Sequence, residues 1–544
     1  MIKILSIKRK KADIIEKTKR LDVESAFFLF LLFCMAIYFG WRLFKLTPWY
    51  DELYTYYYFI SRGPVYAAIH WPLPNNHVGY SVLSAILDLF GNSAIGLRGV
   101  SWLTSLVNLC LIFEIGRKLF PKGFALVPVF VFSSMNIVNS LAVQGRGYAL
   151  ATCLYLTALY ELIQIIVFNA GRKRNYIILA CAFVWGLYTL PSSVYYVIPL
   201  CFIGGGFLLI QKRIKELVKL FITAFISALC TVGLYAVIWL AIGSNLLSKT
   251  SESTYYGEGH LSIILHAPFK AIQTGIQYML DTPYIQSVAR EGYISRFGIW
   301  IKALFENYYS GLSVPLILIV CIGIILIIGK AIFKKRISSF TEWYMLMSFI
   351  LTPLMLIIQA ALPYYRVFSF FAVPIAMLIT WLFVCIYSLV KKRVSGDTDS
   401  SVKDWFPALV SVVSGIMCLI FLLQPSYNWP YSDREAAIED ALDNINLNED
   451  DILCVTDCDQ EYMVKYLFDN ANITFIPQEA DYILFDNIML LSENVVQELD
   501  SYADEWKLYI TYDEIPREYL EKETEVYYEN DRFVIFKRKI NIDD

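Results

Sequence analysis

The sequence predicts a polytopic α-helical membrane protein of about eleven spans that ends in a small α/β domain. Three observations lead to this fold class. Hydrophobic residues make up 57% of the 544 residues and charged residues only 17%, which is less polar surface than a soluble domain of this length needs. Long apolar runs recur along most of the chain. The C-terminal part is acidic and lacks such runs.

Eleven apolar runs are long enough to cross a bilayer, since a helical span needs about 17–25 residues. Eight Lys and Arg precede the first run, and no small-residue cleavage site of a secretory signal follows it. We therefore expect residues 1–23 to form a basic cytoplasmic N-terminus and residues 24–426 to form the membrane domain. The predicted spans are 24–44, 96–116, 122–141, 147–168, 176–190, 193–210, 218–242, 312–330, 343–361, 367–389 and 405–424.

The basic clusters between the runs support this topology. With eleven spans and the N-terminus inside, all of them face the cytoplasm, as the positive-inside rule requires. The clusters are Arg117-Lys118, Arg172-Lys173-Arg174, Lys212-Arg213, Lys334-Lys335-Arg336 and Lys391-Lys392-Arg393. The same parity places the loops 46–95 and 243–311 outside, together with the turns at Gln144–Arg146 and Pro363–Arg366. A tight turn at Thr189–Ser192 leaves the count open by two.

Residues 427–544 differ in composition from the rest of the chain. They contain 30 Asp and Glu against 9 Lys and Arg, a local charge of −21 in a chain whose net charge is −3. Short apolar runs alternate there with helix-like stretches, which is typical of a small α/β domain. No glycine-rich phosphate loop accompanies them, so nucleotide binding is not expected. The predicted strands are 452–455, 482–485, 508–510 and 533–536, and the predicted helices are 434–444 and 492–502.

Two adjacent carboxylates, Asp51 and Glu52, follow the first span within Thr47–Tyr54. Charges close to hydrocarbon are costly unless they are paired or hydrated. One interpretation is that both cap the N-terminus of the following helix, where the helix dipole favours them. The other is that they perform chemistry. Because neighbours on a helix point about 100° apart, we expect Asp51 and Glu52 to have different roles.

Histidines and cysteines give no metal site from their spacing. His70 and His77 lie in the first outer loop and would need Asp51 or Glu52 as a third ligand; surface hydrogen bonding is the alternative. Cys454 and Cys458 have no second pair that would complete a zinc site. No metal ligand is therefore assigned, and a divalent metal enters only as an alternative partner of Glu52.

Arg146 and Arg366 are isolated cations at the outer ends of two predicted spans. Snorkelling of a long side chain to lipid head groups explains such residues routinely. Capture of a phosphate by the bidentate guanidinium fork is the functional alternative. Their shared side with Asp51 favours the functional alternative.

Taken together, these residues resemble the GT-C superfamily of glycosyltransferases, and most nearly its bacterial protein-mannosyltransferase-type members, which include aminoarabinose and lipopolysaccharide-core transferases. The resemblance implies a polyprenyl-phosphate sugar as donor and a role for Asp51 at the acceptor. By the same resemblance, Tyr50, Asn76, His77 and Tyr148 are expected to bind substrate. The matching pieces are Trp49–Glu52, Asn75–Tyr80, Gly91, Leu97-Arg98, Ala142–Tyr148 and Arg366–Pro374.

The expected function is that of an inverting glycosyltransferase at the outer face of the cell membrane. A sugar hydroxyl is a poor nucleophile, so Asp51 is expected to accept its proton, with Glu52 orienting Asp51 or holding a metal. Arg146 and Arg366 are expected to bind the departing lipid phosphate. The acceptor is a glycan, glycolipid or protein, and the relatives' Pro-Pro pair is absent before Val78, which weakens the case for protein. Membrane lipid is an expected partner and nucleic acid is not.

Two other classes of protein remain as alternatives. A secondary transporter places ionisable residues near the bilayer midplane, whereas Glu114 and Glu161 here lie toward the cytoplasmic ends of their spans. A non-catalytic envelope-assembly protein would use the acidic domain to hold partners, and would not depend on Asp51.

Overall fold

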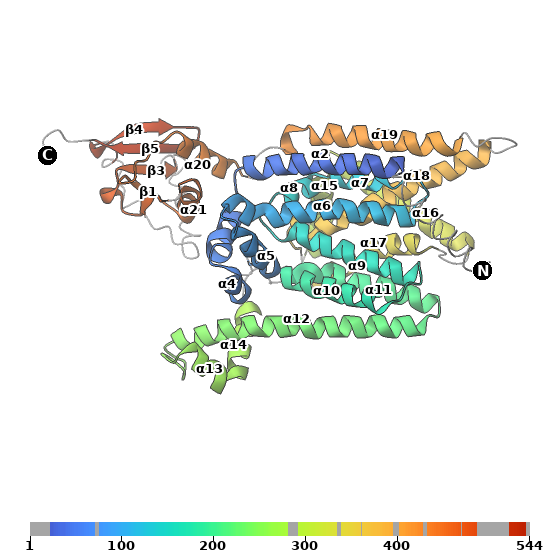
Figure 1. Cartoon of the computed structure of the whole chain (residues 1–544), viewed down its shortest axis with the longest axis horizontal. Helices are drawn as coiled ribbons and strands as arrows, with labels where there is room; N and C mark the ends of the chain where they lie inside the picture. Colours follow the sequence, from blue (N-terminus) through green and yellow to red (C-terminus); the bar gives the residue numbers. More distant parts are fainter. Residues whose placement is uncertain are drawn as a thin grey trace, which may run out of the picture.

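The computed structural model describes residues 22–70, 76–280, 292–334, 339–360, 362–394, 402–427, 432–468, 470–486, 520 and 522–539. A bundle of long helices forms the body, and a small sheet domain lies at one end of it (Figure 1). The predicted basic N-terminus, the helix at 492–502 and the strand at 508–510 fall outside the described residues.

Nine helices of the described residues are long and apolar enough to cross a membrane. Each coincides with a predicted span, so the chain is a multi-pass membrane protein. Asp22 is the N-cap residue of the first of them, and its carboxylate accepts a hydrogen bond from the Ser25 N–H at 2.8 Å. The nine are α2 Val23–Lys45, α6 Ser93–Leu119, α9 Tyr148–Ile166, α11 Val194–Ile210 with η2 Pro191–Ser193, α12 Ile214–Lys249, α16 Ser313–Lys334, α17 Phe340–Gln359, α18 Ala372–Val394 with η4 Tyr365–Phe371, and α19 Val402–Leu422.

The other two predicted spans take a different form. The run 122–141 is not one helix but two short ones, α7 Leu126–Ser133 and α8 Asn136–Ala142. Asn139 donates to the backbone carbonyls of Ser133 and Met135 at the break, so a side chain satisfies groups that a continuous helix would pair itself. The run 176–190 is the helix α10 Lys173–Thr189, of 17 residues.

The first outer loop folds into four short helices at the end of the bundle that bears the sheet domain (Figure 1). They are α3 Tyr50–Thr55, the π-helix η1 Tyr56–Ile60, α4 Pro64–Ile69 and α5 Val78–Asp88. Gly63 has a φ of +92°, which allows the chain to turn sharply before Pro64 begins α4. Asp51 and Glu52 lie in the first turn of α3. Glu52 accepts a hydrogen bond from the N–H of Trp49, the N-cap residue, as the capping interpretation expected of it.

The second outer loop is also helical, with α13 His260–His266, α14 Pro268–Leu280 and α15 Tyr293–Tyr308. The predicted end of the preceding span at 242 was too early, since α12 continues to Lys249. α14 folds back along this extension. A Cβ at Gly243 would lie 1.8 Å from the Ala271 carbonyl oxygen, and a Cβ at Gly275 would lie 2.4 Å from that of Trp239. Glycine at both positions therefore allows the two helices to pack backbone against backbone.

The C-terminal domain has a mixed five-stranded sheet in the order β2-β1-β3-β5-β4. β1 pairs in parallel with β2 and β3, and β5 pairs antiparallel with β3 and β4. Three predicted strands and the first predicted helix are present; β2, β4 and the helix α21 were not predicted. The elements are α20 Asp433–Asp443, β1 Ile452–Cys454, α21 Cys458–Leu467, β2 Asn472–Thr474, β3 Tyr482–Asp486, β4 Thr524–Glu529 and β5 Phe533–Arg538.

This domain rests on the first outer loop through aromatic rings and two carboxylates. Tyr462 of α21 stacks on Tyr57 with ring centroids 5.6 Å apart and lies 6.2 Å from the ring of Tyr50. Glu435 accepts a hydrogen bond from the Tyr50 N–H at 3.2 Å, and Glu439 accepts one from the hydroxyl of Thr47. The loop that carries Asp51 is therefore packed between the bundle and the C-terminal domain.

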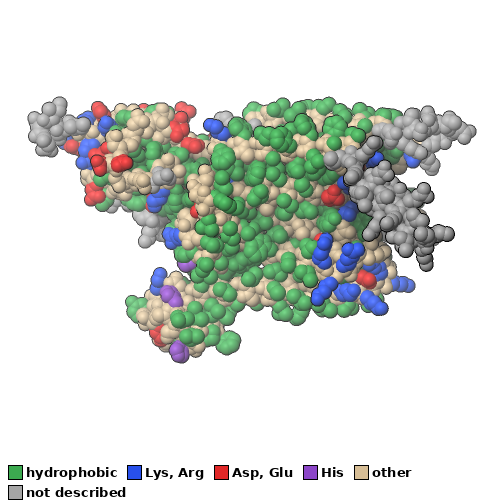
Figure 2. Space-filling view, viewed as in Figure 1, with side chains coloured by type: hydrophobic (Ala, Val, Ile, Leu, Met, Phe, Trp, Pro, Cys, Tyr) green, Lys and Arg blue, Asp and Glu red, His purple; other side chains and the backbone are tan. Residues whose placement is uncertain are grey.

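The surface agrees with a bundle that lies in a membrane. A broad hydrophobic belt covers its middle, and Lys and Arg side chains gather at the end away from the C-terminal domain (Figure 2). Both outer loops and the C-terminal domain lie together at the opposite end (Figure 1). The predicted grouping of these segments on one face is therefore observed.

We predict that Tyr462→Ala loosens the C-terminal domain from the loop. Tyr462 is 6% exposed, and truncating a buried aromatic ring costs about 3 kcal/mol. Faster release of the domain by limited proteolysis, with a lower apparent Tm, is the expected result. Tyr527→Ala on the edge strand β4, where the ring is 38% exposed, is the matched control; equal effects of the two changes would contradict the docking role.

Candidate active site

Asp51, Arg146 and Arg366 lie together where α3, the turn before α9 and η4 meet. Oδ2 of Asp51 is 3.0 Å from Nη2 of Arg366. Nη1 of Arg146 donates to the backbone carbonyl of Asp51 at 3.1 Å. These residues are remote along the sequence, and their shared face was the only reason to expect them in one place.

The two adjacent carboxylates point in different directions. The Asp51 side chain is 17% exposed and can be reached from outside. Glu52 is fully buried, and both of its oxygens accept from Arg98, at 2.8 Å from Nε and 2.9 Å from Nη2. Glu52 also accepts from the N–H groups of Trp49 and Gly145. Its oxygens are thus occupied by protein donors, which suits a residue that holds the loop.

Arg98 is a functional residue to which the sequence analysis gave no role. Its guanidinium donates to the carbonyl oxygens of Leu43, Leu46 and Thr47 as well as to Glu52, and it is 1% exposed. The chain at the end of the first span is thereby fixed to α6. The signal was present in the sequence, since Arg98, like Arg146, is an isolated cation near the outer end of an apolar span.

Three aromatic rings surround the guanidinium of Arg366. Its Cζ lies 4.9 Å from the ring centroids of Trp49 and Tyr364 and 5.7 Å from that of Tyr148. Such cation–π contacts hold a cation in place while leaving its N–H groups available to an anion. η4, a 3-10 helix that leads into α18, brings Arg366 to this position. The Arg366 side chain is 22% exposed, so this cation is accessible, as Asp51 is.

Arg146 is held more deeply. Nη1 donates to the hydroxyl of Thr55 at 2.6 Å, and Nη2 lies 3.2 Å from Nε2 of His77. Nδ1 of His77 accepts a hydrogen bond from the Gly147 N–H at 2.8 Å. Burial and the positive charges of Arg146 and Arg366 lower the pKa of His77 well below its ordinary value.

The two partners of the His77 ring can only donate. Arg146 faces Nε2 and the Gly147 N–H faces Nδ1, so a neutral imidazole accepts a hydrogen bond at whichever nitrogen lacks the proton. The site therefore combines one carboxylate, two guanidinium groups and one neutral imidazole.

Two glycines allow the turn before α9 to approach the first loop. A Cβ at Gly145 would lie 3.0 Å from Oε1 of Glu52, and a Cβ at Gly147 would lie 3.1 Å from Cβ of His77. Both distances are tighter than ordinary contacts, so a side chain at either position would crowd the first loop. The backbone amides that hold Glu52 and His77 depend on this close approach.

The remaining residues that were expected to bind substrate are placed differently from one another. Tyr148 is 4% exposed and meets His77 edge to face, with centroids 4.9 Å apart. Asn76 donates to the carbonyl oxygens of Ala67 and His70, and so it supports the loop itself. The ring of Tyr50 faces Tyr462 in the C-terminal domain. Tyr148 and His77 therefore lie at the site, whereas the contacts of Asn76 and Tyr50 are to the surrounding structure.

Potential metal ligands do not cluster at this site. Among the described residues, no group of three or more His, Cys, Asp or Glu side chains is arranged to hold a metal ion. His70 stacks on Tyr66 with centroids 3.7 Å apart, whereas His77 faces Arg146. All eleven cysteines are free thiols.

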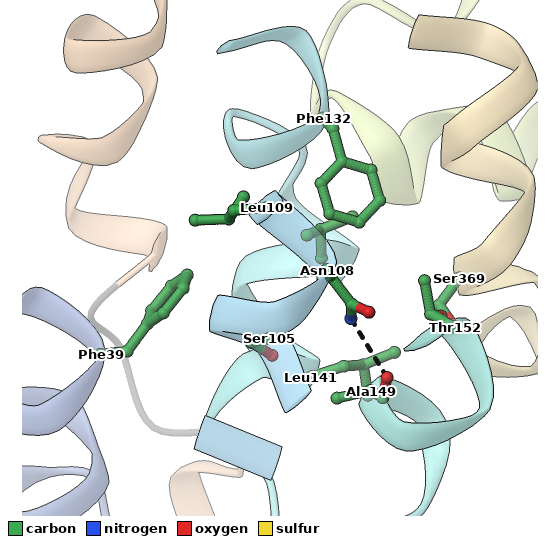
Figure 3. Close-up of a pocket in the computed structure, with 10 residues that line it drawn as sticks. Phe39, Ser105, Asn108, Leu109, Phe132, Leu141, Ala149, Thr152 and Ser369 are labelled. Carbon is green, nitrogen blue, oxygen red and sulfur yellow. Dashed lines mark hydrogen bonds between the residues drawn. The ribbon is translucent and has the colours of Figure 1, made fainter. Parts of the chain in front are cut away.

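A small, mostly apolar cavity with a few polar side chains lies inside the bundle (Figure 3), about one to two helical turns inward from the site along α6 and α9. Its volume is 10 Å³, which is about the space of one water molecule. Asn108 donates to the Ala149 carbonyl at 3.1 Å, and the hydroxyls of Thr152 and Ser369 are 3.0 Å apart. A sugar does not fit in this cavity.

The fold and this site define a polytopic membrane protein with a carboxylate–guanidinium centre at one end of its bundle. Residues 77–242 match the family described as dolichyl-phosphate-mannose-protein mannosyltransferase. ArnT from Cupriavidus metallidurans, solved with undecaprenyl phosphate bound, has a similar structure with a TM-score of 0.53 at 11% identity, over 94% of this chain and 97% of that one. The chain is therefore similar in sequence to this family over residues 77–242 and similar in fold to ArnT, which agrees with the resemblance that the motifs suggested.

A second solved structure and the curated protein sequences were also compared with this chain. The oligosaccharyltransferase AglB from Archaeoglobus fulgidus, solved with an inhibitory peptide and a dolichol-phosphate, gives a TM-score of 0.46 at 12% identity, over 86% of this chain and 70% of that one. No curated protein sequence matches this chain.

We predict that Glu52 and Arg98 stabilise the fold as a pair. Removing one partner of a buried ion pair leaves the other uncompensated, so Glu52→Gln or Arg98→Met should each cost about 3–5 kcal/mol. The double variant should cost clearly less than the sum. Thermal unfolding of the four proteins in one detergent measures this coupling; strictly additive losses would show that the two side chains act independently.

A pH dependence follows from His77. Its pKa in the folded protein lies below the unfolded value of about 6.5, so the unfolded state binds the extra proton first. The stabilisation is complete above about pH 6.5 and is lost as the pH falls. His77→Gln should therefore flatten the acid side of a plot of Tm against pH, whereas His260→Gln, at an exposed position, should not. An unchanged slope in His77→Gln would refute this assignment.

Proposed function

We propose that this protein is a glycosyltransferase that moves a sugar from a polyprenyl-phosphate carrier to an acceptor at the face bearing the two outer loops. The observation that carries the proposal is the accessible ion pair of Asp51 and Arg366, with Arg146 behind it. A transferase of this kind needs a base for the acceptor and cations for the leaving phosphate, and this pair supplies both within one contact.

Asp51 acts as the general base. The acceptor hydroxyl attacks the anomeric carbon and transfers its proton to the Asp51 carboxylate. The bond between the anomeric carbon and the phosphate oxygen breaks, and its electron pair leaves with the lipid phosphate. Direct displacement in one step inverts the anomeric configuration. Glu52 does not touch the substrates in this scheme; bound to Arg98, it is a positioning residue for Asp51.

Arg366 and Arg146 stabilise the departing phosphate. The developing negative charge is greatest on the phosphate oxygens, where donors that are already in place contribute most. Arg366 is held by its aromatic rings, and Arg146 is held by Thr55. His77 lies beside Arg146, with its Nε2 3.2 Å from Nη2. A fixed set of donors of this kind does not need to reorganise as charge develops.

Binding of the donor also prepares the base. While Arg366 is paired with Asp51, its guanidinium occupies the carboxylate oxygen Oδ2, which an acceptor hydroxyl would have to reach. A lipid phosphate competes for the same guanidinium and releases Asp51 toward the acceptor. The base is thereby activated only when the donor is bound.

The comparisons support a lipid-phosphate donor. The matching family is described by a dolichyl-phosphate sugar donor, and the ArnT structure of similar fold holds undecaprenyl phosphate. The site also lies at the end of apolar helices, where a lipid-linked substrate can reach it from the bilayer. The acceptor is a glycan, glycolipid or protein, and the sugar is a hexose or pentose.

The proposed site faces the outside of the cell. Lys and Arg side chains gather at the opposite end of the bundle (Figure 2), and the positive-inside rule places that end in the cytoplasm. The N-terminus is then cytoplasmic, and the C-terminal domain is extracytoplasmic.

We predict that Asp51→Asn lowers sugar transfer by about 10²–10⁴-fold, because general-base catalysis contributes about that much. The assay follows a labelled polyprenyl-phosphate sugar with membranes or purified protein from each variant. Glu258→Gln, an exposed acid in the second outer loop, is the matched control and should keep full activity. Turnover equal to wild type in Asp51→Asn would remove Asp51 from the mechanism.

Arg366→Gln tests the phosphate site separately. We expect a lower kcat together with a higher KM for the donor, since Arg366 meets the phosphate both before and during transfer. Arg62→Gln is the control: Arg62 lies in the first outer loop and donates to the Tyr57 carbonyl and the Tyr66 hydroxyl, so its loss should leave both parameters unchanged. A change confined to the KM for the acceptor would place Arg366 on the other substrate.

A further inference from the structure

A second cavity lies at the basic end of the bundle, remote from Asp51. Its volume is 680 Å³, within the range of about 300–1,000 Å³ that is typical of small-molecule sites. The ends of α6, α9 and α11 and the start of α17 enclose it. Since α6 begins at the first outer loop, its last residues, Lys118 and Leu119, lie at the opposite end from the candidate active site.

The polar lining of the cavity is cationic. Lys118 and Arg213 line it, and no Asp or Glu does. The Lys118 ammonium sits over the rings of Phe168 and Tyr160, with centroids at 4.8 and 5.3 Å. No carboxylate among the described residues forms an ion pair with Lys118. An anion in the cavity would therefore meet an ammonium group that the protein holds in place without neutralising it.

Arg213 mainly shapes the wall. It donates to the carbonyl oxygens of Ile165 and Ile166 at the end of α9, both at 2.9 Å. Its Nε lies 3.8 Å from Glu216, which offsets part of its charge. Lys118 is therefore the principal charge that faces the cavity.

The start of α17 adds hydrogen-bond donors. Ser339 is its N-cap and makes no side-chain cap hydrogen bond, so the N–H groups of the first turn remain directed out of the helix end. The hydroxyl of Thr341 lines the cavity without a hydrogen-bond partner, although the residue is only 7% exposed. Glu342 in the same turn is paired with Lys330 instead. The hydroxyl of Thr341, the N-terminus of α17 and the ammonium group of Lys118 thus belong to the lining of one cavity, and phosphate oxygens accept from donors of these kinds.

We propose that this cavity binds a phosphate ester at the basic end of the bundle, carried either by a lipid head group or by a soluble compound. The apolar part of the wall, Leu119, Val167 and Phe207, suits the glycerol and upper acyl carbons of a lipid. This site is separate from the proposed transfer reaction and does not depend on it.

The test measures binding to the full chain in a neutral detergent by isothermal titration calorimetry. The probes are dioctanoyl phosphatidic acid, inorganic phosphate and dioctanoylglycerol, which lacks the phosphate. Each is titrated into the wild type and into Arg366→Gln, so that binding at the candidate active site is separated from binding in the cavity. We expect saturable binding of phosphatidic acid or phosphate that survives in Arg366→Gln.

The cavity variants are Lys118→Gln and Thr341→Val. Losing a hydrogen bond to a charged group weakens binding by about tenfold or more, so we expect such a loss for Lys118→Gln and a smaller one for Thr341→Val. Arg117→Gln is the matched control, because Arg117 is the neighbouring exposed cation and pairs with Glu114. An unchanged Tm without ligand shows that each variant folds.

The outcomes separate the two sources and decide the proposal. Binding of phosphatidic acid alone identifies a lipid head group, and equal or better binding of inorganic phosphate identifies a soluble ester; both support the site. Equal binding of dioctanoylglycerol, an equal loss in Arg117→Gln, loss of all binding in Arg366→Gln, or no binding of any probe would overturn it.

Discussion

The buried ion pair of Glu52 and Arg98 is the contact on which the site depends. Two charges taken out of water cost several kcal/mol each unless they are paired and fully hydrogen-bonded. Here both conditions are met, because Glu52 also accepts from backbone N–H groups and Arg98 also donates to backbone carbonyl oxygens. The pair thereby joins the end of the first span, α6 and the turn before α9. Glu52 is fixed, so Asp51 next to it must point the other way, toward Arg366.

Much of the membrane domain could be predicted from the sequence, because length and polarity decide whether a run crosses a bilayer. The bilayer also holds the outer ends of all spans at one surface. The number of spans between Asp51, Arg146 and Arg366 places all three at that surface, although the sequence shows no contact between them. The distance of 3.0 Å between Asp51 and Arg366 depends on how the first loop and η4 fold, and neither carries a periodic pattern. The count of spans therefore predicts on which face of the membrane these residues lie, whereas tertiary packing determines which of them are in contact.

Several contacts and elements could not be predicted from local sequence patterns. Tyr50 stands beside Asp51, but its ring meets Tyr462, a residue with no local signal that links it to the loop. Asn76 hydrogen-bonds the backbone of its own loop, which residue type alone does not distinguish from substrate binding. The three-residue strand β2 is too short to show alternation. The break between α7 and α8 lies beside Ser133, Ser134 and Asn136, and these few polar residues leave the mean hydropathy of the run high enough for a single span.

The pairing of Asp51 with Arg366 answers two demands at once. Near the hydrocarbon boundary, an unpaired carboxylate and an unpaired guanidinium would both be destabilising, so their pairing stabilises the protein before substrate binds. The transfer that we propose requires the opposite, with the carboxylate free for a proton and the guanidinium free for a phosphate. In that proposal the anionic donor replaces Asp51 as the partner of Arg366, so the number of paired charges stays the same. Asp51 then takes the place of the donor phosphate as the unpaired charge, beside the sugar that is to be transferred.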